Sequence, residues 1–248
     1  MVKVLDNGYI QIVETYGSDA SIIEAARMST DKGFQGWGHW LCSQCGEGKP
    51  DFGSPCECGG RVEYKNGDEK LLAYLWNNKH ATPFEMAGAI VEVQAPIFVF
   101  REWHRHRTQS YNELSARYTA LPDLFYHPHI DRLLNGGQAT TNKQSSGATL
   151  SSDTAYRAAG ILSASYRRSR EDYELLLSLG VARELARAVI PTAQYSRMRA
   201  SANLRNWLSF LTLREAPGAQ WEIRQYANAL HGLLAEAFPR TLALFEAG

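Results

Sequence analysis

The densest group of side chains that could do chemistry lies in residues 101–118, which read REWHRHRTQSYNELSARY. Arginine presents a planar fork of N–H donors that matches phosphate oxygens two at a time, so several arginines close together suit a ligand with more than one phosphate. The alternative is a solvated helix face whose arginines form ion pairs with Glu102 and Glu113. The arginines of this segment are Arg101, Arg105, Arg107 and Arg117.

A second group of reactive side chains is the set of cysteines in CSQCGEGKPDFGSPCECGG, at residues 42–60. A Cys-x-x-Cys pair and a Cys-x-Cys pair, each followed by glycine, resemble two zinc knuckles that together supply four thiolates to one tetrahedral Zn²⁺. Disulfides are disfavoured in a reducing cytosol, so we expect zinc rather than disulfides or free thiols. The four expected ligands are Cys42, Cys45, Cys56 and Cys58.

This cysteine-rich segment can have one of two purposes. It can stabilise a loop or an oligomer contact, or it can bind nucleic acid as some zinc ribbons do. Its basic residues are few, namely Lys49, Arg61 and Lys65, so we expect the structural role and consider nucleic acid an unlikely partner.

Residues 105–118 are informative through the order of their residue types as well as through their positive charge. An RHR triplet is followed at fixed offsets by Ser, Asn-Glu, Ser and Arg-Tyr, and this pattern resembles the signature of flavin-dependent thymidylate synthases. Further blocks resemble the family in the family's order, and only the cysteine segment and parts of residues 132–152 fall outside them. These blocks are AARMS near residue 27, HATPFE at 80–85, APIFVFREW at 95–103, ARELARAVIP at 182–191, NLRNWLSFLTLR at 203–214 and AQWEI at 219–223.

The resemblance implies a reaction and its partners. NADPH would reduce bound FAD, and a one-carbon unit from 5,10-methylenetetrahydrofolate together with a hydride would convert dUMP to dTMP. It also implies an α+β fold and a homotetramer with active sites built between subunits. The protein would supply positioning and electrostatics, because the cofactors carry the redox chemistry.

The resemblance also implies site residues. FAD would be held by the RHR triplet with residues from other segments: Thr82, Glu85, Arg105, His106, Arg107, Glu113, Asn203, Arg205 and Ser209. The nucleotide dUMP would be held by Glu102, Arg105, Glu113, Leu114, Ser115, Ala116, Arg117, Arg187 and Arg214. Structural alternatives exist for some positions, since Thr82 can begin a helix with Pro83 and Asn203 can cap the helix that follows it.

Arg214 and Ser115 are the candidate catalytic residues. A fixed cation beside the uracil would favour ionisation at N3 and push electron density toward C5, the carbon to be alkylated, which is the role expected of Arg214. A serine needs an adjacent base to become a nucleophile, and the sequence shows no obvious base near Ser115. We therefore expect Ser115 to bind and orient the nucleotide.

A second class of function is a zinc-ribbon nucleic-acid-binding protein that uses the arginine cluster on phosphates. This hypothesis does not explain why so many sequence blocks follow the order found in flavin-dependent thymidylate synthases. The chain also carries 26 Lys+Arg and 26 Asp+Glu, so no global positive field favours nucleic acid. Bound yellow flavin would separate the two hypotheses.

The elements that must position these residues follow from periodicity and caps. The first 17 residues alternate like strands, and Ser18 or Asp19 can cap a helix. Residues 132–152 lack periodicity and are predicted to be a long loop. The remaining expectations are helices at 68–80, 96–107 with Pro96 as first residue, 154–180 ending at Gly180, 182–191, 203–215 and 219–238, and strands at 89–95 and 192–202.

Together these elements predict an α+β fold, with helices packed on a mainly antiparallel sheet. We expect one catalytic domain over residues 1–248, with a zinc-ribbon-like insertion at 36–66. The N-terminus lacks the apolar core of a signal peptide, and no apolar run approaches the roughly 20 residues of a membrane span, so the expected location is the cytosol.

Overall fold

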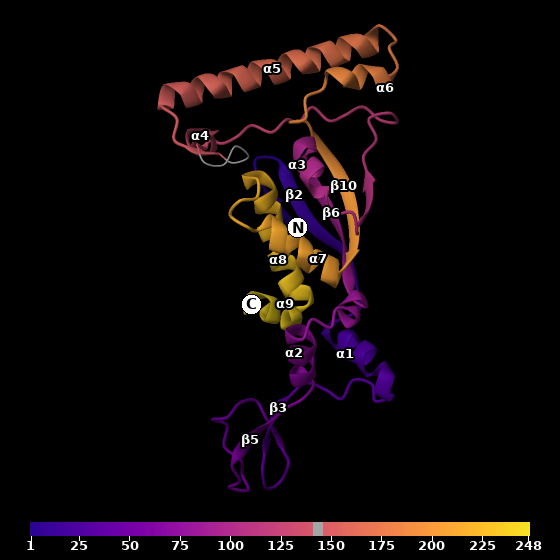
Figure 1. Ribbon diagram of the computed structural model, residues 1–248, viewed down its shortest axis with the longest axis vertical. Coiled ribbons are helices and arrows are strands. Elements are labelled where there is room, and N and C mark those ends of the chain that lie inside the picture. The colour runs from indigo at the N-terminus through magenta and orange to yellow at the C-terminus, as the bar shows by residue number, and fades with distance from the viewer. Residues whose placement is uncertain (141–145) are drawn as a thin grey trace. The chain divides into compact units, whose positions relative to one another are not determined.

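The computed structural model describes residues 1–140 and 146–248, and the chain divides into two compact units (Figure 1). The first unit comprises residues 1–14, 90–202 and 209–233. The second comprises residues 15–89, 203–208 and 234–248. No helix of the described residues is long and apolar enough to cross a membrane.

The main sheet has five strands in the order β1-β2-β6-β10-β7. The pairs β1/β2 and β10/β7 are antiparallel, as predicted for this α+β fold. Burial alternates along the middle of β6, where Val91, Val93 and Ala95 are fully buried, because successive side chains of a strand point to opposite faces. The strands are β1 (Val2–Val4), β2 (Gly8–Tyr16), β6 (Gly88–Pro96), β7 (Ser110–Glu113) and β10 (Tyr195–Asn203).

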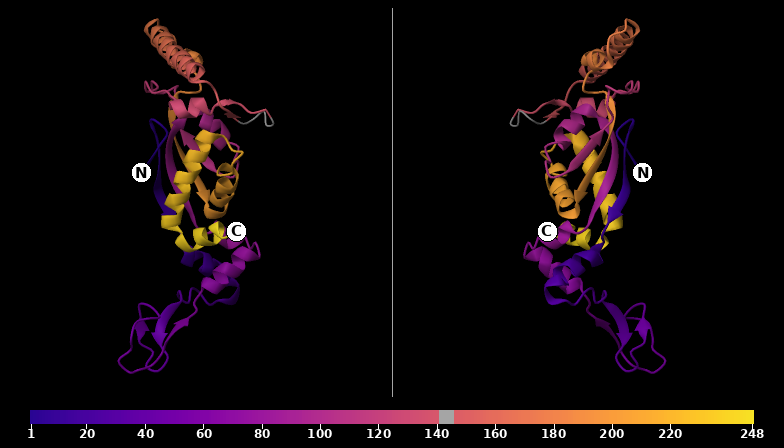
Figure 2. Two further views of the ribbon diagram at one scale, coloured as in Figure 1. Left: turned by 90° about the vertical axis from the view of Figure 1, so that its left-hand side faces the viewer. Right: turned by 90° about the vertical axis from the view of Figure 1, so that its right-hand side faces the viewer.

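Helices cover one face of the sheet in the first unit (Figure 2). They are α3 (Ile97–Trp103) and the parts of α7 (Leu204–Arg214) and α8 (Trp221–Ala237) that belong to this unit. Trp103 and Phe210 are fully buried, with ring centroids 4.5 Å apart. The Tyr226 hydroxyl donates to the Gln94 carbonyl at 2.8 Å, which ties α8 to β6.

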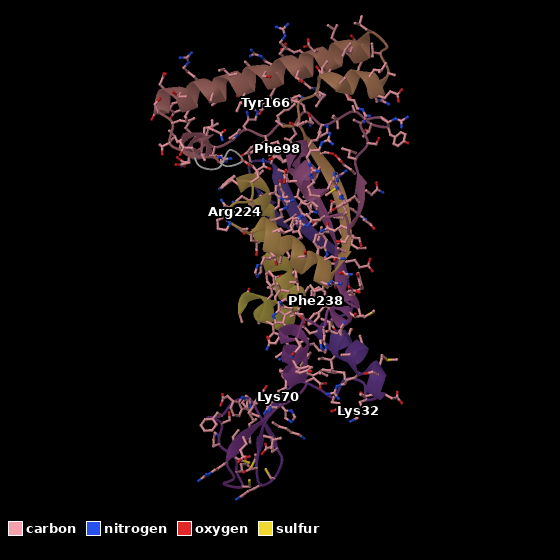
Figure 3. The ribbon with its side chains drawn as sticks, viewed as in Figure 1. Lys32, Lys70, Phe98, Tyr166, Arg224 and Phe238 are labelled. Carbon is pink, nitrogen blue, oxygen red and sulfur yellow. The ribbon has the colours of Figure 1, made fainter. Side chains whose placement is uncertain are left out.

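The long helix α5 (Ser152–Ser178) also belongs to the first unit. It begins at Ser151, whose hydroxyl accepts from the Thr154 amide, and it ends before Gly180, which has a φ of +80° as predicted for a helix stop. Its Tyr166, labelled in Figure 3, stacks on Phe125 with ring centroids 5.2 Å apart. Two short helical segments follow it, α6 (Arg183–Ala186) and η3 (Arg187–Val189).

Two predictions for the first unit need correction. The segment expected to be a loop at 132–152 contains most of α4 (Ile130–Leu134) and the paired strands β8 (Gly137–Gln138) and β9 (Ser146–Ala148), while residues 141–145 lie outside the described part. The helix expected at 96–107 ends at Trp103, because the backbone turns over the next residues, with the Arg107 amide bonded to the Arg105 carbonyl at 3.1 Å. Pro96 precedes this helix as its N-cap rather than standing at its first position.

The second unit is built from short helices and carries the cysteine segment. Ser18, one of the two predicted caps, accepts from the Ser21 amide at the start of α1 (Asp19–Arg27). Asp19, buried at the start of α1, accepts from the hydroxyl and amide of Thr241 at 2.6 and 3.1 Å. Its other helical segments are η1 (Met28–Thr30), α2 (Glu69–Asn77), η2 (Thr82–Glu85) and α9 (Pro239–Glu246), and α9 was not predicted.

The cysteine segment forms a separate three-stranded sheet in the order β4-β3-β5. We call residues 36–66 the ribbon. Its strands are β3 (His39–Cys42), β4 (Gly48–Lys49) and β5 (Val62–Lys65), and both neighbours of β3 run antiparallel to it. This confirms a small ribbon-like insertion with its four cysteines grouped together.

Candidate active site

Arg214, at the end of α7, is the most completely held of the predicted site arginines. Its Nε donates to Nε2 of His106 at 2.9 Å, and one terminal nitrogen donates to a Glu102 carboxylate oxygen at 2.9 Å. The other terminal nitrogen donates to the Glu102 carbonyl at 2.8 Å. The Arg214 side chain is only 14% exposed, so the guanidinium is both fixed in direction and largely shielded from water.

His106 is neutral in this arrangement. A guanidinium has only N–H donors, so the Nε2 atom that faces Arg214 must accept, and the imidazole proton lies on Nδ1. Burial and the positive charge of Arg214 lower the pKa of His106 to about 4, against an opposing effect of Glu102. The ring also packs on Phe210, with centroids 4.7 Å apart. His106 therefore supports Arg214 without adding a second positive charge.

The other arginines of the motif differ from Arg214. Arg101, Arg105 and Arg107 are exposed. Within residues 1–140 and 146–248, no hydrogen bond or ion pair occupies their side chains. This argues against the alternative in which these arginines pair with Glu102 and Glu113, since Glu102 pairs with Arg214 instead. The free guanidinium forks can bind an anion without first breaking an ion pair.

The end of the motif forms a turn after β7. Leu114 donates its amide to the Arg197 carbonyl of β10 at 2.8 Å, and the Ser115 hydroxyl accepts from the Arg117 amide at 3.3 Å. No histidine or carboxylate of the described residues bonds to the Ser115 hydroxyl, so the structure provides no base to activate it. Ala116, within the turn, is buried, and Glu113 at the end of β7 is exposed.

Two arginines far apart in sequence meet at Glu184. The Nε atom of Arg117 lies 3.2 Å from the Glu184 carboxylate, and Nε of Arg187 donates to the Glu184 carbonyl at 3.3 Å. The side chains of Arg117 and Glu184 are each about half exposed, so this pair is surrounded by water. The structure thus brings the predicted residues Arg117 and Arg187 together beside α6.

Sequence reasoning missed Glu184 and Phe210. Glu184 stands three residues before Arg187, and Phe210 stands four residues before Arg214. Residues at these separations lie on the same face of a helix, so their helical spacing is the signal that could have identified both as neighbours of site arginines.

The remaining predicted FAD contacts lie mostly in the second unit. Arg205 forms an ion pair with Glu85. The Asn203 side-chain oxygen accepts from the Asn206 amide at 2.9 Å, which is the contact of a residue that caps α7. Thr82 is exposed at the start of η2, followed by Pro83, as the structural alternative expected. Ser209 lies exposed on the part of α7 that belongs to the first unit.

The four cysteines form a cluster of their own in the second unit, as their spacing predicted.

Comparison with known proteins identifies the family. The family model described as "Thymidylate synthase complementing protein" matches residues 11–240. The chain is 38% identical to the flavin-dependent thymidylate synthase of Thermus thermophilus, over 99% of this chain and 78% of that protein. The chain belongs to the flavin-dependent thymidylate synthase family. A relative from Anaplasma marginale with the same name is 36% identical, over 98% of this chain and 74% of that one.

Solved structures agree with this membership. A UMP/dUMP methylase from Streptomyces cacaoi bound with 5-Br UMP superposes with a TM-score of 0.77 at 29% identity, covering 99% of this chain and 96% of that one. The structure of the same enzyme with 5-Br dUMP gives a TM-score of 0.77 at 30% identity. Nothing in these comparisons favours the nucleic-acid-binding alternative.

Proposed function

We propose that this member of the family methylates dUMP to dTMP, with FAD and NADPH supplying the reducing equivalents and 5,10-methylenetetrahydrofolate supplying the carbon. The observation that carries the proposal is the fixed, shielded guanidinium of Arg214 beside the RHR motif. A preorganised cation of this kind stabilises negative charge that develops on a bound ring.

The contacts of Arg214 suggest how it acts. Glu102 and His106 use three of the five N–H groups of the guanidinium, so two remain for a ligand. Binding the uracil through these donors would favour the N3 anion and raise electron density at C5. Because His106 is neutral and Glu102 carries the opposing charge, Arg214 is held in place without competition from another cation. The expected role of Glu102 is thus to position Arg214.

The nucleotide phosphate needs donors that are not already neutralised. Arg105 is exposed without an ion pair among the described residues, and Arg117 and Arg187 share a solvent-exposed partner in Glu184. An exposed pair is weak enough to be displaced by a phosphate dianion. Leu114, Ser115 and Ala116 would present the turn that orients the nucleotide, with Glu113 beside it.

The residues present also fit an anionic dinucleotide such as FAD. The unpaired forks of Arg105 and Arg107 suit its pyrophosphate. The Asn203 side chain uses its oxygen on the α7 cap, which leaves its amide N–H groups as donors. Bound FAD would supply the hydride chemistry, and the protein would hold and orient it through Thr82, Glu85, His106, Glu113, Arg205 and Ser209 in addition.

We propose a homotetramer, and the exposed face of α5 and α6 supports it. Several large apolar side chains on these helices or at the C-cap of α5 are more than half exposed, which is unusual for a surface that stays in water. Each would be covered by another copy of the chain. These side chains are Tyr156 at 66%, Ile161 at 68%, Leu175 at 57%, Leu179 at 70% and Leu185 at 65% exposure.

We also propose a domain organisation and a cellular location for the chain. Residues 1–248 would form the catalytic domain with residues 36–66 as an insertion. The proposed location is the cytosol, where disulfides between the four cysteines would be disfavoured. The cysteines have no role in methyl transfer, and a Zn²⁺ ion bound there would be structural.

The visible spectrum of the purified protein and its products test the proposal. We expect the two absorption bands of oxidised flavin, their bleaching by NADPH under anaerobic conditions, and dTMP when methylenetetrahydrofolate and dUMP are added. UMP should be offered in a parallel reaction to define the sugar preference. A colourless protein that does not bind added FAD would contradict the assignment.

A further inference from the structure

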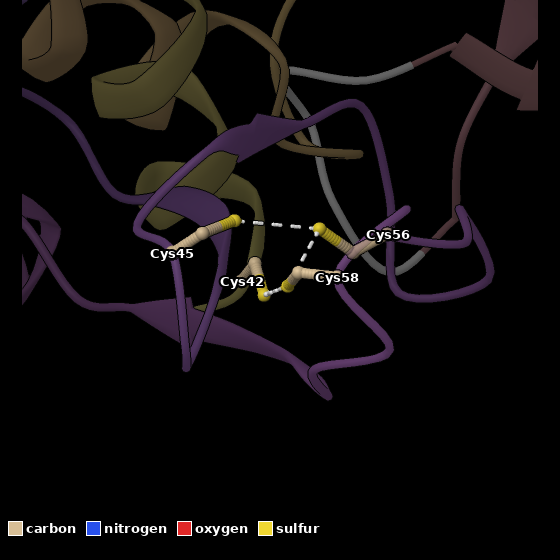
Figure 4. Close-up of side chains that lie close together, drawn as sticks. All are labelled: Cys42, Cys45, Cys56 and Cys58. Carbon is tan, nitrogen blue, oxygen red and sulfur yellow. Dashed lines mark hydrogen bonds between the residues drawn. The ribbon is translucent and has the colours of Figure 1, made fainter.

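The four cysteine sulfurs lie around one point in the ribbon (Figure 4). Sγ of Cys42 is 3.3 Å from Sγ of Cys58, and Sγ of Cys56 is 3.4 Å from those of both Cys45 and Cys58. All four sulfurs are within 4.8 Å of one another. Four thiolates about 2.3 Å from a tetrahedral Zn²⁺ are roughly 3.8 Å apart. The spacing therefore suits a shared ion.

The backbone beside the cysteines is shaped for this purpose. The Gly46 amide donates to the Cys42 carbonyl and the Gly59 amide to the Cys56 carbonyl, each at 2.9 Å. Both glycines have a φ of +74°, a conformation that other residues rarely adopt. Each cysteine pair thus stands on a tight glycine turn that directs its sulfurs inward.

Position 60 requires glycine because the backbone there passes close to a cysteine sulfur. A Cβ atom added at this position would lie 2.4 Å from Sγ of Cys42, well inside contact distance. By contrast, a Cβ added at Gly48 in β4 would meet no atom within 4 Å. The two glycines therefore provide a matched pair of substitutions that test the sulfur cluster without removing a ligand.

Little besides a metal could stabilise the ribbon. Of residues 36–66, all of which are described, only Cys42 and Val62 are buried. A segment this small with so little buried apolar surface cannot offset the conformational entropy lost on ordering. Small folds of this kind usually need a metal or disulfides, and the four cysteines are free thiols.

The base of the ribbon is linked to two helices of its own unit. Glu69 at the start of α2 accepts from the amides of Gly38 and Gly67 at 2.7 and 3.1 Å. Arg240 of α9 lies 3.1 Å from the Glu69 carboxylate, and its guanidinium is 4.2 Å from the ring centroid of Trp37. The base of the ribbon is therefore connected to α9 through the Glu69 carboxylate and the Arg240 guanidinium.

We propose that Cys42, Cys45, Cys56 and Cys58 bind one Zn²⁺, and that this ion fixes both the ribbon and the contact of its base with α9. Zinc is favoured over harder cations because all four ligands are sulfur. None of the four cysteines is among the residues proposed above to hold dUMP or FAD.

Elemental analysis of the freshly purified full-length chain is the first test. We expect about one Zn²⁺ per chain, with neither iron nor the visible absorbance of an iron–sulfur cluster. Absence of zinc from protein prepared without chelator would overturn the proposal, and stoichiometric iron would overturn the identity of the metal. Metal content is measured separately from enzyme activity. The zinc proposal can therefore fail while the synthase proposal holds, and the reverse is also true.

The glycine pair provides the second test. Gly60→Ala should lower zinc content and increase amide hydrogen exchange in residues 36–69 and in α9, whereas Gly48→Ala should leave both unchanged. If Gly60→Ala does not fold, chelation of the wild-type chain followed by return of Zn²⁺ gives the same comparison. Exchange that rises in the ribbon but not in α9 would refute the link through Arg240, and no rise in either would refute the structural role.

Discussion

The Arg214 site and the ribbon assemble polar groups in opposite ways. Arg214 reaches His106 and Glu102 across 108 and 112 positions of sequence, whereas the cysteines meet across 11 and 16. The Arg214 site has its geometry imposed by a packed core that includes Trp103 and Phe210. The ribbon has almost no core and depends on its own ligands. A substitution in the Arg214 site should therefore change the rate of reaction, and a substitution in the ribbon should change how well the segment is ordered.

The largest effect on stability is expected from Asp68→Ala at the base of the ribbon. Asp68 is 2% exposed, pairs with Arg27 and accepts from the Gln35 amide at 2.7 Å. Its loss leaves a mostly buried cation and an amide without a partner, which should cost about 3 kcal/mol in free energy of unfolding. Denaturant unfolding measures this, and Asp51→Ala in the exposed part of the ribbon is the control. A change below about 0.5 kcal/mol would show that the base is not rigid.

Arg214→Ala should produce the largest effect on chemistry. Loss of a fixed cation that stabilises charge in the transition state is expected to lower turnover by about 10- to 1,000-fold. Single-turnover oxidation of reduced flavin, with dUMP and methylenetetrahydrofolate in excess and dTMP quantified, measures it. The matched control is Arg61→Ala, an exposed arginine of the ribbon. An undiminished rate in Arg214→Ala would remove the electrostatic role.

His106 should make stability depend on pH. Its pKa is about 4 in the folded chain against 6.5 when unperturbed, because burial and Arg214 disfavour the imidazolium. The unfolded chain therefore binds a proton first as pH falls, so the contribution of His106 is complete above about 6.5 and is lost as pH falls toward 4. We expect His106→Gln to reduce the pH dependence of the free energy of unfolding in this window. Equal profiles for wild type and His106→Gln would contradict a neutral, half-buried imidazole.

Ser115→Ala should have a smaller effect that separates binding from catalysis. Loss of one neutral hydrogen bond is expected to weaken dUMP binding by about 1 kcal/mol and to leave turnover at saturating dUMP measurable. Calorimetric titration with dUMP and the single-turnover assay provide the two readouts, with Ser54→Ala in the ribbon as control. Complete loss of dTMP formation with nucleotide still bound would instead make the serine a nucleophile.

The smallest effect is expected at Glu184. Because its pair with Arg117 is exposed, Glu184→Gln should change the free energy of unfolding by about 0 to 1 kcal/mol. It should also tighten dUMP binding slightly, since a carboxylate no longer competes with phosphate for Arg117. Weaker binding of dUMP would show that Glu184 holds Arg117 in its binding position.

Local patterns in the sequence predicted local structure well. Spacing alone indicated that the four cysteines would gather, and a polar pair before an apolar stripe narrowed the cap of α1 to Ser18 or Asp19, of which Ser18 is the cap. Gly180 also predicted the end of α5, because that prediction depends only on the backbone conformation of one residue. In each case the determining contacts lie within about 16 positions of sequence.

Contacts made by folding were not predictable in this way. Glu102 was expected near the nucleotide, but its pairing with Arg214 depends on how α3 and α7 approach each other. The neutral state of His106 follows from that same approach. The helix expected at 96–107 ended early because tertiary context overrode the helical periodicity of its apolar residues. Helix α9 was overlooked although Pro239 stands at its start.

The two ends of the ribbon touch. The Asp68 amide donates to the Gly36 carbonyl at 3.0 Å, and a Cβ on Gly67 would lie 2.4 Å from the Gly38 nitrogen. A segment that leaves and returns at one point can be gained, lost or exchanged during evolution without rerouting the chain on either side. For protein engineering, the same crossing is a natural place to graft a reporter or an affinity module into this enzyme, with Gln35 and Asp68 as the junction.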